Sequence, residues 1–192
     1  MTIVFWFCIG VLVYVHLGYP LAVWFLAQLK PRRDELPDPD PWPSVSLVIA
    51  AHNEEKVMAA KLANALALDY PGDRLEIIVA SDGSTDRTDS IVAELQQKNV
   101  RLLRIDGHLG KTAVQNAAAA MATGDIIVFS DANAMYEADV IRRLARYFSR
   151  PDVGCVEGRR ADFAEGASAT ARHEVTYRDW ESRIKVWESR VL

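Results

Sequence analysis

The chain has 192 residues, half of them hydrophobic, and a formal net charge of −4. That length allows one compact domain of ordinary size with a short appendage, and it leaves no room for a second large domain. The acidic balance offers no basic field to a nucleic-acid backbone, so nucleic acid is excluded as a partner. The two cysteines, Cys8 and Cys155, lie far apart in sequence. This pattern is typical of a reducing compartment and speaks against a zinc site.

The chain begins with a long apolar segment from Ile3 to Leu29. A helix of about 27 residues at ~1.5 Å per residue would be roughly 40 Å long, enough to cross the core of a bilayer. A cleaved signal peptide is the alternative. However, no basic residue precedes the apolar run, the run is too long for a signal core, and no small-x-small pattern precedes Lys30. We therefore expect a retained transmembrane helix over residues 1–29, kinked by Pro20.

Basic residues and prolines follow the apolar segment directly. Lys30, Arg32 and Arg33 mark the cytoplasmic end of the helix, since basic residues flank that end, so the N-terminus is expected outside and the next domain in the cytoplasm. Residues 30–43 include five prolines, which exclude a regular helix and predict an extended linker. Trp42, near the end of this linker, is expected either to cover an edge of the domain or to rest at the lipid headgroups.

Beyond the linker, short β-branched runs alternate with longer helical patterns, which is typical of a mostly parallel sheet with helices on both faces. The expected strands are Val45–Ala50, Leu75–Ala80, Val100–Ile105, Ile126–Ser130 and Val153–Val156. The expected helices are Glu54–Ala67, Asp86–Gln97, Thr112–Ala122 and Ala138–Phe148. Right-handed crossovers would assemble these elements into a Rossmann-like α/β sheet, with a ligand beyond the carboxyl ends of the strands.

The polar loop SDGSTD, residues 81–86, joins a predicted buried strand to a helix. Ser84 or Thr85 could cap the start of that helix. Asp82 should project from the strand tip, where its carboxylate could accept a hydrogen bond from the imide N–H of uracil or from a ribose hydroxyl. Asp86 is expected only to cap the helix and to complement its dipole.

A second loop, from Asp106 to Lys111, opens the next predicted helix with two glycines and a cation. Its backbone N–H groups and the Lys111 ammonium could lie near phosphate oxygens. The loop is not a Walker motif, because only two residues separate Gly107 from Gly110. A solvated lysine at a helix start is the alternative interpretation.

The tripeptide Asp131-Ala132-Asn133 follows the strand expected at Ile126–Ser130. Two oxygen-bearing side chains two residues apart can face one divalent cation, and a bound diphosphate could complete the ligand shell. Hard oxygen ligands favour Mg²⁺ or Mn²⁺ over a soft-ligand metal. An Asx-turn that ends the strand is the alternative for an isolated motif of this kind.

Taken together, these motifs resemble those of family 2 glycosyltransferases. The resemblance covers roughly residues 44–160, and it depends on the order and spacing of several segments. The segments are PSVSLVIAAHNEE at 43–55, SDGSTD at 81–86, Gly110-Lys111 with Asn116, and Asp131-Ala132-Asn133.

The resemblance implies a GT-A fold, an α/β architecture with a mostly parallel sheet, that binds a nucleotide-diphospho-sugar, commonly a UDP-sugar. Asp82 would contact the base, Lys111 the nucleotide or diphosphate, and Asp131 a Mg²⁺ or Mn²⁺ ion. The acceptor would be a saccharide or a lipid at the cytoplasmic face of the membrane. The residues implied in donor binding are Ala50, Asn53, Glu54, Asp82, Lys111 and Asp131.

Two residues depart from the family pattern. Ser81 stands where many members have a first aspartate, and Asn133 replaces the second carboxylate of the usual D-x-D. The Asn133 amide is a neutral and therefore weaker ligand, but it still offers an oxygen. The predicted metal ligands are Asp131 and Asn133.

The catalytic base has no candidate in this sequence. Inverting members are expected to use a carboxylate that deprotonates the acceptor hydroxyl, in a later Glu-Asp-type motif. No such motif follows Arg160, and a Gln/Arg-x-x-Arg-Trp motif is also absent. We therefore expect residues 44–168 to form a donor-binding domain, with the base beyond Leu192 in a longer protein.

The last segment, Ala169 to Leu192, predicts an amphipathic helix that begins an acceptor-binding half. Its apolar stripe consists of Tyr177, Trp180, Ile184, Trp187 and Val191. Two rival functions remain at this stage. One is a membrane-tethered nucleotide-sugar-binding module or pseudoenzyme. The other, a nicotinamide dehydrogenase, lacks the G-x-G-x-x-G that it needs after the first strand.

Overall fold

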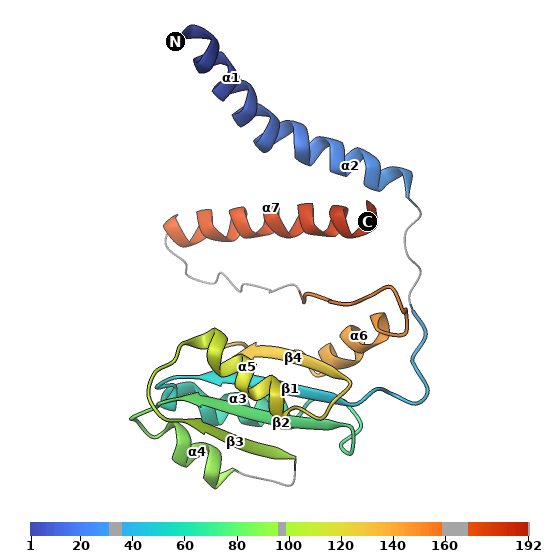
Figure 1. The fold of residues 1–192 in the computed structure, drawn as a ribbon. Coiled ribbons are helices and arrows are strands. Elements are labelled where there is room, and N and C mark those ends of the chain that lie inside the picture. Colours follow the sequence, from blue (N-terminus) through green and yellow to red (C-terminus); the bar gives the residue numbers. More distant parts are fainter. Residues whose placement is uncertain (31–35, 96–98, 159–168, 192) are drawn as a thin grey trace. The chain divides into compact units, whose positions relative to one another are not determined.

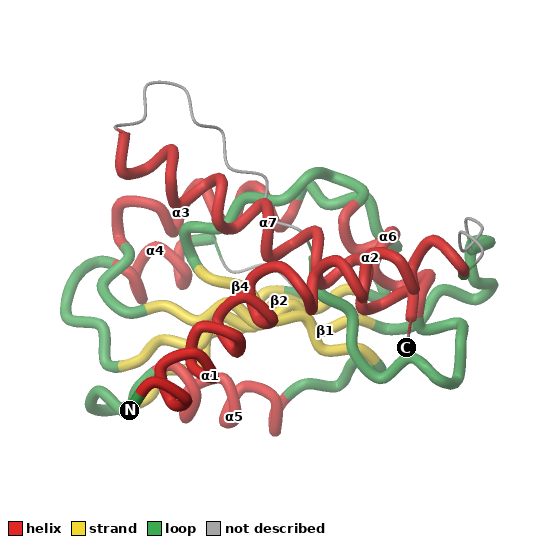
Figure 2. The backbone as a smooth tube through the Cα atoms, turned by 90° about the horizontal axis from the view of Figure 1, so that it is seen from above, coloured by secondary structure: helices red, strands yellow, loops and turns green. Residues whose placement is uncertain are grey.

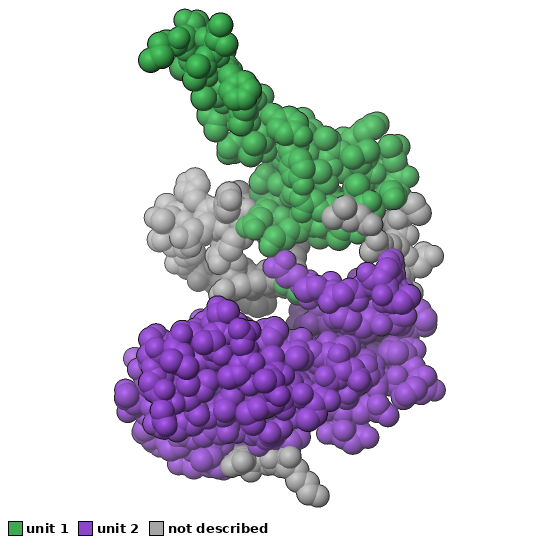
Figure 3. Space-filling view, in the orientation of Figure 1, with its two compact units in different colours: residues 1–35, 158–192 green, residues 36–157 purple. Residues whose placement is uncertain are grey.

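The computed structural model describes residues 1–30, 36–95, 99–158 and 169–191. It divides into two compact units, Met1–Glu35 with Gly158–Leu192 and Leu36–Glu157, coloured separately in Figure 3. Several predicted features extend beyond the described residues: linker residues 31–35, the end of the helix expected to reach Gln97, the domain end at 159–168, and Leu192.

The first unit contains the long apolar helix and the last helix of the chain. Thr2–Leu29 is long and apolar enough to cross a membrane, as judged from its length and composition. It comprises α1 (Thr2–Val13), the π-helical turn η1 (Tyr14–Gly18) and α2 (Tyr19–Leu29).

The π-helical turn ends at Gly18, two residues before Pro20. Proline lacks an N–H group, and its ring clashes with the carbonyl four residues earlier. A wider turn relieves that clash, and Figure 1 shows the helix bending between α1 and α2. The predicted kink is therefore present.

The predicted C-terminal helix is also present, as α7 (Ala169–Val191). Trp180 and Trp187 lie about two helical turns apart. Their rings meet edge to face, with 6.0 Å between centroids. The two tryptophans of the predicted stripe therefore share one side of the helix.

The second unit is built on a parallel four-stranded sheet with strand order β3-β2-β1-β4 (Figure 1). The strands are β1 (Val45–Ala51), β2 (Leu75–Asp82), β3 (Val100–Ile105) and β4 (Ile126–Asp131). In register, Ala50 of β1 pairs with Ala80 of β2 on one side and with Asp131 of β4 on the other. The carboxyl ends of these three strands therefore form one edge of the sheet.

Helices cover both faces of the sheet, as Figure 2 shows for α3 and α4 on one side and α5 on the other. The helices of this unit are α3 (Glu55–Leu66), α4 (Thr88–Glu94), α5 (Lys111–Met121) and α6 (Val140–Tyr147). The predicted α/β class and its parallel sheet are confirmed.

The core follows the alternation of side chains along the strands. Leu47 and Ile49 of β1 belong to the larger hydrophobic cluster, with residues of α3, α4 and α6. Val48, between them, packs with Val114 and Ala118 of α5 on the opposite face. Each fully buried Leu or Ile contributes roughly 2 kcal/mol to folding.

Trp42 covers the domain, as the first of the two interpretations of this residue expected. It packs against the larger hydrophobic cluster, and its ring meets the Tyr70 ring edge to face with 5.6 Å between centroids. The Arg142 guanidinium lies 5.0 Å from the Trp42 ring centroid, in cation–π geometry.

The strand predicted at Val153–Val156 is wrong. In the described residues 153–158 the chain has no regular structure, and Cys155 is exposed. A short apolar run forms a strand only when a neighbouring strand accepts its hydrogen bonds, and Gly154 weakens the intrinsic preference further.

The start of α4 also differs from prediction. The helix begins at Thr88, two residues later than expected. Ser84 and Thr85 therefore do not cap it. Asp86 does satisfy its first N–H, because an Asp86 carboxylate oxygen accepts the Thr88 amide at 2.9 Å and the Thr88 hydroxyl at 2.6 Å.

Candidate functional site

A cleft of about 270 Å³ lies at the carboxyl edge of the sheet. It brings together residues at or just beyond the carboxyl ends of all four strands, together with the start of α5. The residues that line it are Ala50, Ala51, His52, Glu54, Asp82, His108, Lys111, Val114, Asp131, Ala132 and Asn133. Asp82 and Asp131, which are far apart in sequence, therefore face one shared cleft.

Asp82 is the buried carboxylate of the cleft, with 4% of its surface exposed. Its two carboxylate oxygens accept the backbone N–H groups of Leu109, at 2.8 Å, and Gly110, at 3.0 Å. Burial opposes ionisation of Asp82. The two backbone hydrogen bonds and the nearby His108 and His52 outweigh burial, so the pKa of Asp82 lies below its ordinary value. Asp82 is therefore an anion that can accept hydrogen bonds at neutral pH.

The turn after Asp82 requires glycine. Gly83 has φ of 62°, which lies in the left-handed region. A Cβ at this position would also collide with the carbonyl oxygen of Gly107. This close approach holds the loop after β2 against the loop after β3, and it directs Asp82 to the N–H groups of Leu109 and Gly110.

Two histidines flank Asp82, and the sequence analysis did not select them. His52 Nδ1 lies 2.6 Å from the Asp82 backbone oxygen, and His108 Nδ1 lies 2.7 Å from its carboxylate. Both contacts require an N–H on Nδ1, because a carbonyl or carboxylate oxygen can only accept. The two rings lie 4.3 Å apart between centroids. The signal that could have found them is their position, since each follows a strand at the ligand-bearing edge.

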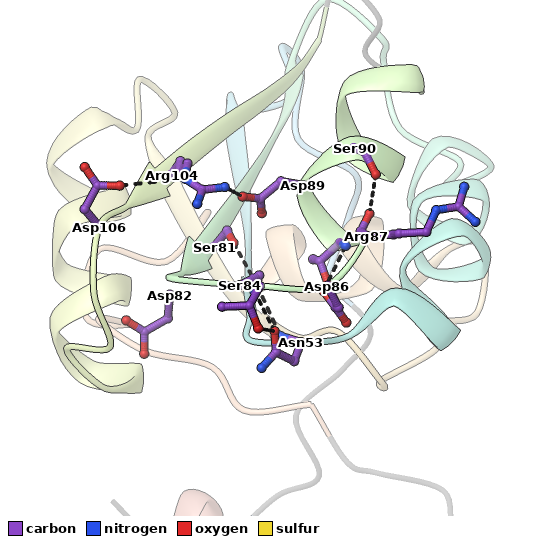
Figure 4. Close-up of polar contacts among 12 residues, drawn as sticks. Asn53, Ser81, Asp82, Ser84, Asp86, Arg87, Asp89, Ser90, Arg104 and Asp106 are labelled. Carbon is purple, nitrogen blue, oxygen red and sulfur yellow. Dashed lines mark hydrogen bonds and ion pairs between the residues drawn. The ribbon is translucent and has the colours of Figure 1, made fainter.

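Asn53 is the predicted donor-binding residue that does not line the cleft as the structure describes it. Its φ is 54°, and its amide oxygen accepts the Thr85 N–H at 2.8 Å. The Asn53 backbone N–H donates to the Ser84 hydroxyl at 3.1 Å. In Figure 4, Asn53 and Ser84 lie together while the Asp82 carboxylate points away from them. Asn53 therefore joins the loop after β1 to the loop after β2.

Lys111 and Asp131 face each other across the cleft. The Lys111 ammonium lies 2.5 Å from an Asp131 carboxylate oxygen. Lys111 is the first residue of α5, and its N-cap Gly110 has φ of 88°. The start of this helix and the lysine together present positive charge, the arrangement that binds phosphate in other proteins.

Asp131 and Asn133 are the residues of the cleft that could hold a divalent cation. Both side chains line the cleft, and both are exposed. A carboxylate and an amide oxygen suit Mg²⁺ or Mn²⁺. The ligand atoms of His52, Asp82 and His108 also lie within 4.8 Å of one another. Two of those three groups are imidazoles, and a hard cation such as Mg²⁺ or Mn²⁺ prefers oxygen ligands like those of Asp131 and Asn133.

Comparison with known proteins identifies the relatives of this chain. A family model described as glycosyl transferase family 2 matches residues 46–191. The beta-monoglucosyldiacylglycerol synthase of Synechocystis sp. is 38% identical over 125 residues, which cover 63% of this chain and 26% of that enzyme. The N-acetylglucosaminyltransferase of Mesorhizobium japonicum is 30% identical over 138 residues, covering 69% of this chain and 32% of that enzyme. The chain thus spans about a quarter to a third of the length of these relatives.

Solved structures share the fold. The mannosyltransferase PcManGT from Pyrobaculum calidifontis, in complex with GDP-Man and Mn²⁺, superposes with a TM-score of 0.66 and 34% identity. The match covers 77% of this chain and 46% of that protein. Residues 1–349 of TarS from S. aureus in complex with UDP-GlcNAc give a TM-score of 0.52 at 24% identity, covering 55% of this chain and 31% of that protein. The Rossmann-like GT-A fold class expected from the sequence is confirmed.

Proposed function

The chain belongs to glycosyl transferase family 2, and we propose that its cleft binds the nucleoside diphosphate part of a nucleotide-sugar donor. One observation carries the proposal. Asp82 at the end of β2, Asp131 at the end of β4 and Lys111 at the start of α5 line one cleft at the carboxyl edge of a parallel sheet. In open α/β sheets the ligand binds at this edge.

The base of the nucleotide is assigned to the Asp82 end of the cleft. The Asp82 carboxylate is ionised and buried, so it is a strong acceptor for the imide N–H of uracil. We therefore propose a UDP-sugar as the donor. Guanine also presents N–H groups to an acceptor, and the mannosyltransferase relative was solved with GDP-Man. Calorimetry with uridine and guanosine ligands separates the two bases.

The diphosphate is assigned to the Lys111 and Asp131 end of the cleft. Lys111 and the N-terminus of α5 attract phosphate oxygens, and Asp131 with Asn133 would hold Mg²⁺ or Mn²⁺. When bound, the ion supplies positive charge that neutralises the departing diphosphate. Ala50 and Glu54 line the same cleft, whereas Asn53 shapes it by joining two of its loops.

The apolar helix and the relatives support a proposal for the acceptor. The Thr2–Leu29 helix would tether the domain to a membrane, and the basic residues after it favour a cytoplasmic domain. The Synechocystis relative is a beta-monoglucosyldiacylglycerol synthase, which supports a lipid acceptor, with a saccharide as the alternative. We propose that this chain supplies the donor-binding part of the transferase, and we assign the catalytic base to none of its residues.

Calorimetry on the full chain in detergent tests the proposal. The ligands are UDP, GDP, UDP-glucose and GDP-mannose, each with and without MnCl₂, and NAD serves as the control. The proposal predicts saturable heat with the uridine ligands, stronger in Mn²⁺, and none with NAD. Tighter binding of the guanosine ligands would show that the donor carries guanine and not uracil. No binding of any nucleoside diphosphate would refute the proposal.

A further inference from the structure

Lys61 of α3 is a fully buried charged side chain in the second unit. Its ammonium donates to the Ser130 hydroxyl at 2.8 Å and to the Ala134 backbone oxygen at 2.5 Å. It also lies 4.0 Å from the centroid of the Tyr136 ring. Burial lowers the pKa of Lys61 to about 8, against the opposing pull of the Asp131 charge.

The two acceptors of Lys61 flank the predicted metal ligands. Ser130 immediately precedes Asp131, and Ala134 immediately follows Asn133. The turn between them is closed by the Ala134 N–H, which donates to the Asp131 backbone oxygen at 3.2 Å. The ammonium thus connects the two ends of the short turn that presents the Asp131 and Asn133 side chains to the cleft.

A second residue of α3 also binds the segment that follows β4. Asn64, one turn after Lys61, donates to the Tyr136 backbone oxygen at 2.9 Å and accepts the Tyr136 N–H at 2.9 Å. Residues 130–136 are therefore attached to α3 at three backbone atoms and one hydroxyl. A helix is a rigid element, so it can fix the turn more closely than solvent could.

Stability alone gives no reason for a charge at position 61. Replacing a buried charge by an apolar side chain of similar volume is often neutral or stabilising. What an ammonium provides and a methionine does not is a pair of directed hydrogen bonds to the two ends of the turn. Metal sites depend on such supporting bonds, whose removal typically costs 10–100-fold in metal affinity.

We propose that Lys61 is a positioning residue for the divalent metal: its buried ammonium holds the Ser130–Ala134 turn so that the Asp131 and Asn133 oxygens face one ion. This role rests on the proposed donor site. Lys61 touches neither the metal nor the donor and acts through the turn.

Two variants of the full chain test the role. Lys61→Met removes the ammonium and keeps an unbranched side chain that is one heavy atom shorter. Lys56→Met is the matched control, because Lys56 is an exposed lysine on the same helix. UDP binding is titrated by calorimetry at increasing Mn²⁺, and the melting temperature of each protein is measured in parallel.

The Lys61→Met chain is expected to need about tenfold more Mn²⁺ for half-maximal enhancement of UDP binding. Its affinity for UDP without metal should stay within about twofold of the unaltered chain, because Asp82 and the base end of the cleft do not change. The melting temperature should not fall. The Lys56→Met chain should behave as the unaltered chain. An unchanged Mn²⁺ response in Lys61→Met, or equal losses with and without metal, would overturn the role.

A second measurement reads the turn itself and needs no ligand. Amide hydrogen exchange of the peptide covering residues 131–136 should become faster in Lys61→Met, while peptides of β1 and β2 keep their rates. Should the Lys61→Met chain fail to fold, Ser130→Ala removes one of the two acceptors and should shift exchange and Mn²⁺ dependence in the same direction. If the unaltered chain binds no UDP, the donor proposal fails, and the exchange rates still decide whether Lys61 holds the turn. Equal exchange rates for residues 131–136 in Lys61→Met and in the unaltered chain would overturn that role.

Discussion

The Lys111 ammonium and the Asp131 carboxylate lie 2.5 Å apart, although one begins α5 and the other ends β4. Both side chains are more than half exposed, at 59% and 53%. Water screens such a pair, so it contributes at most about 1 kcal/mol to folding. The pair therefore adds little to folding, which agrees with the proposed roles of Lys111 in binding phosphate and of Asp131 in binding a metal.

Lys111→Met is expected to lower UDP affinity in Mn²⁺ about tenfold, the cost of one charge-assisted contact of roughly 1.4 kcal/mol. Its melting temperature should remain close to that of the unaltered chain, because the exposed ion pair adds little to folding. Calorimetry and a thermal melt on the same sample check both parts. A large drop in melting temperature with unchanged UDP affinity would assign Lys111 to the fold instead.

Substitution of Asn53 should lower the stability of the fold in two ways, through the lost side-chain hydrogen bond and through the left-handed backbone angle. Asn53→Ala removes the acceptor of the Thr85 N–H and places alanine at φ of 54°, at a cost of about 2 kcal/mol. Asn53→Gly loses the same hydrogen bond but tolerates the angle, so the cost should be about 1 kcal/mol. Thermal unfolding of the two chains gives the comparison. Equal destabilisation would show that the left-handed conformation contributes nothing.

Gly83 and Gly107 form a matched pair for substitution by alanine, since both have positive φ. At Gly83 a Cβ would also collide with the Gly107 carbonyl, whereas at Gly107 it would meet open space. We expect Gly107→Ala to cost about 1 kcal/mol and Gly83→Ala at least about 3 kcal/mol. UDP affinity should fall with Gly83→Ala, because Asp82 precedes it directly. Similar stability for both variants would contradict the close approach of the two loops.

Lys61 should make folding stability depend on pH in alkaline solution. Its pKa falls from 10.5 to about 8 on folding, so between these values the unfolded chain binds more protons than the folded one. Stability should therefore rise with pH across this window, and the penalty for the buried charge should be fully present below pH 8. Unfolding of the unaltered chain and of Lys61→Met at pH 7.5, 9 and 10 measures the difference. If Lys61→Met shows the same rise, another group titrates.

The sheet and the shared cleft could be predicted from the sequence because both follow from local patterns and one rule of topology. The β-branched runs identified β1 to β4, and the rule that ligands lie beyond the carboxyl ends of parallel strands brought Asp82 and Asp131 together. The prediction of a strand at Val153–Val156 was wrong because a strand forms only beside another strand that pairs with it. A local sequence pattern carries no information about such a partner.

The contacts of the histidines beside Asp82 and of the buried Lys61 could not be predicted, and for one physical reason. Each acts through a contact between segments at least 26 residues apart, such as Lys61 with Ser130 or His108 with Asp82. A lysine in a helical pattern looks like any solvated lysine until the turn that accepts its hydrogen bonds is placed beside it.

The most direct test is UDP calorimetry, with and without Mn²⁺, on Asp82→Asn and Asp131→Asn in the full chain. Because the two carboxylates are assigned to opposite ends of one ligand, Asp82→Asn should weaken UDP binding in both conditions, and Asp131→Asn should abolish only the enhancement by Mn²⁺. If both variants bind UDP as the unaltered chain does, with the Mn²⁺ effect intact, these two side chains do not hold the donor.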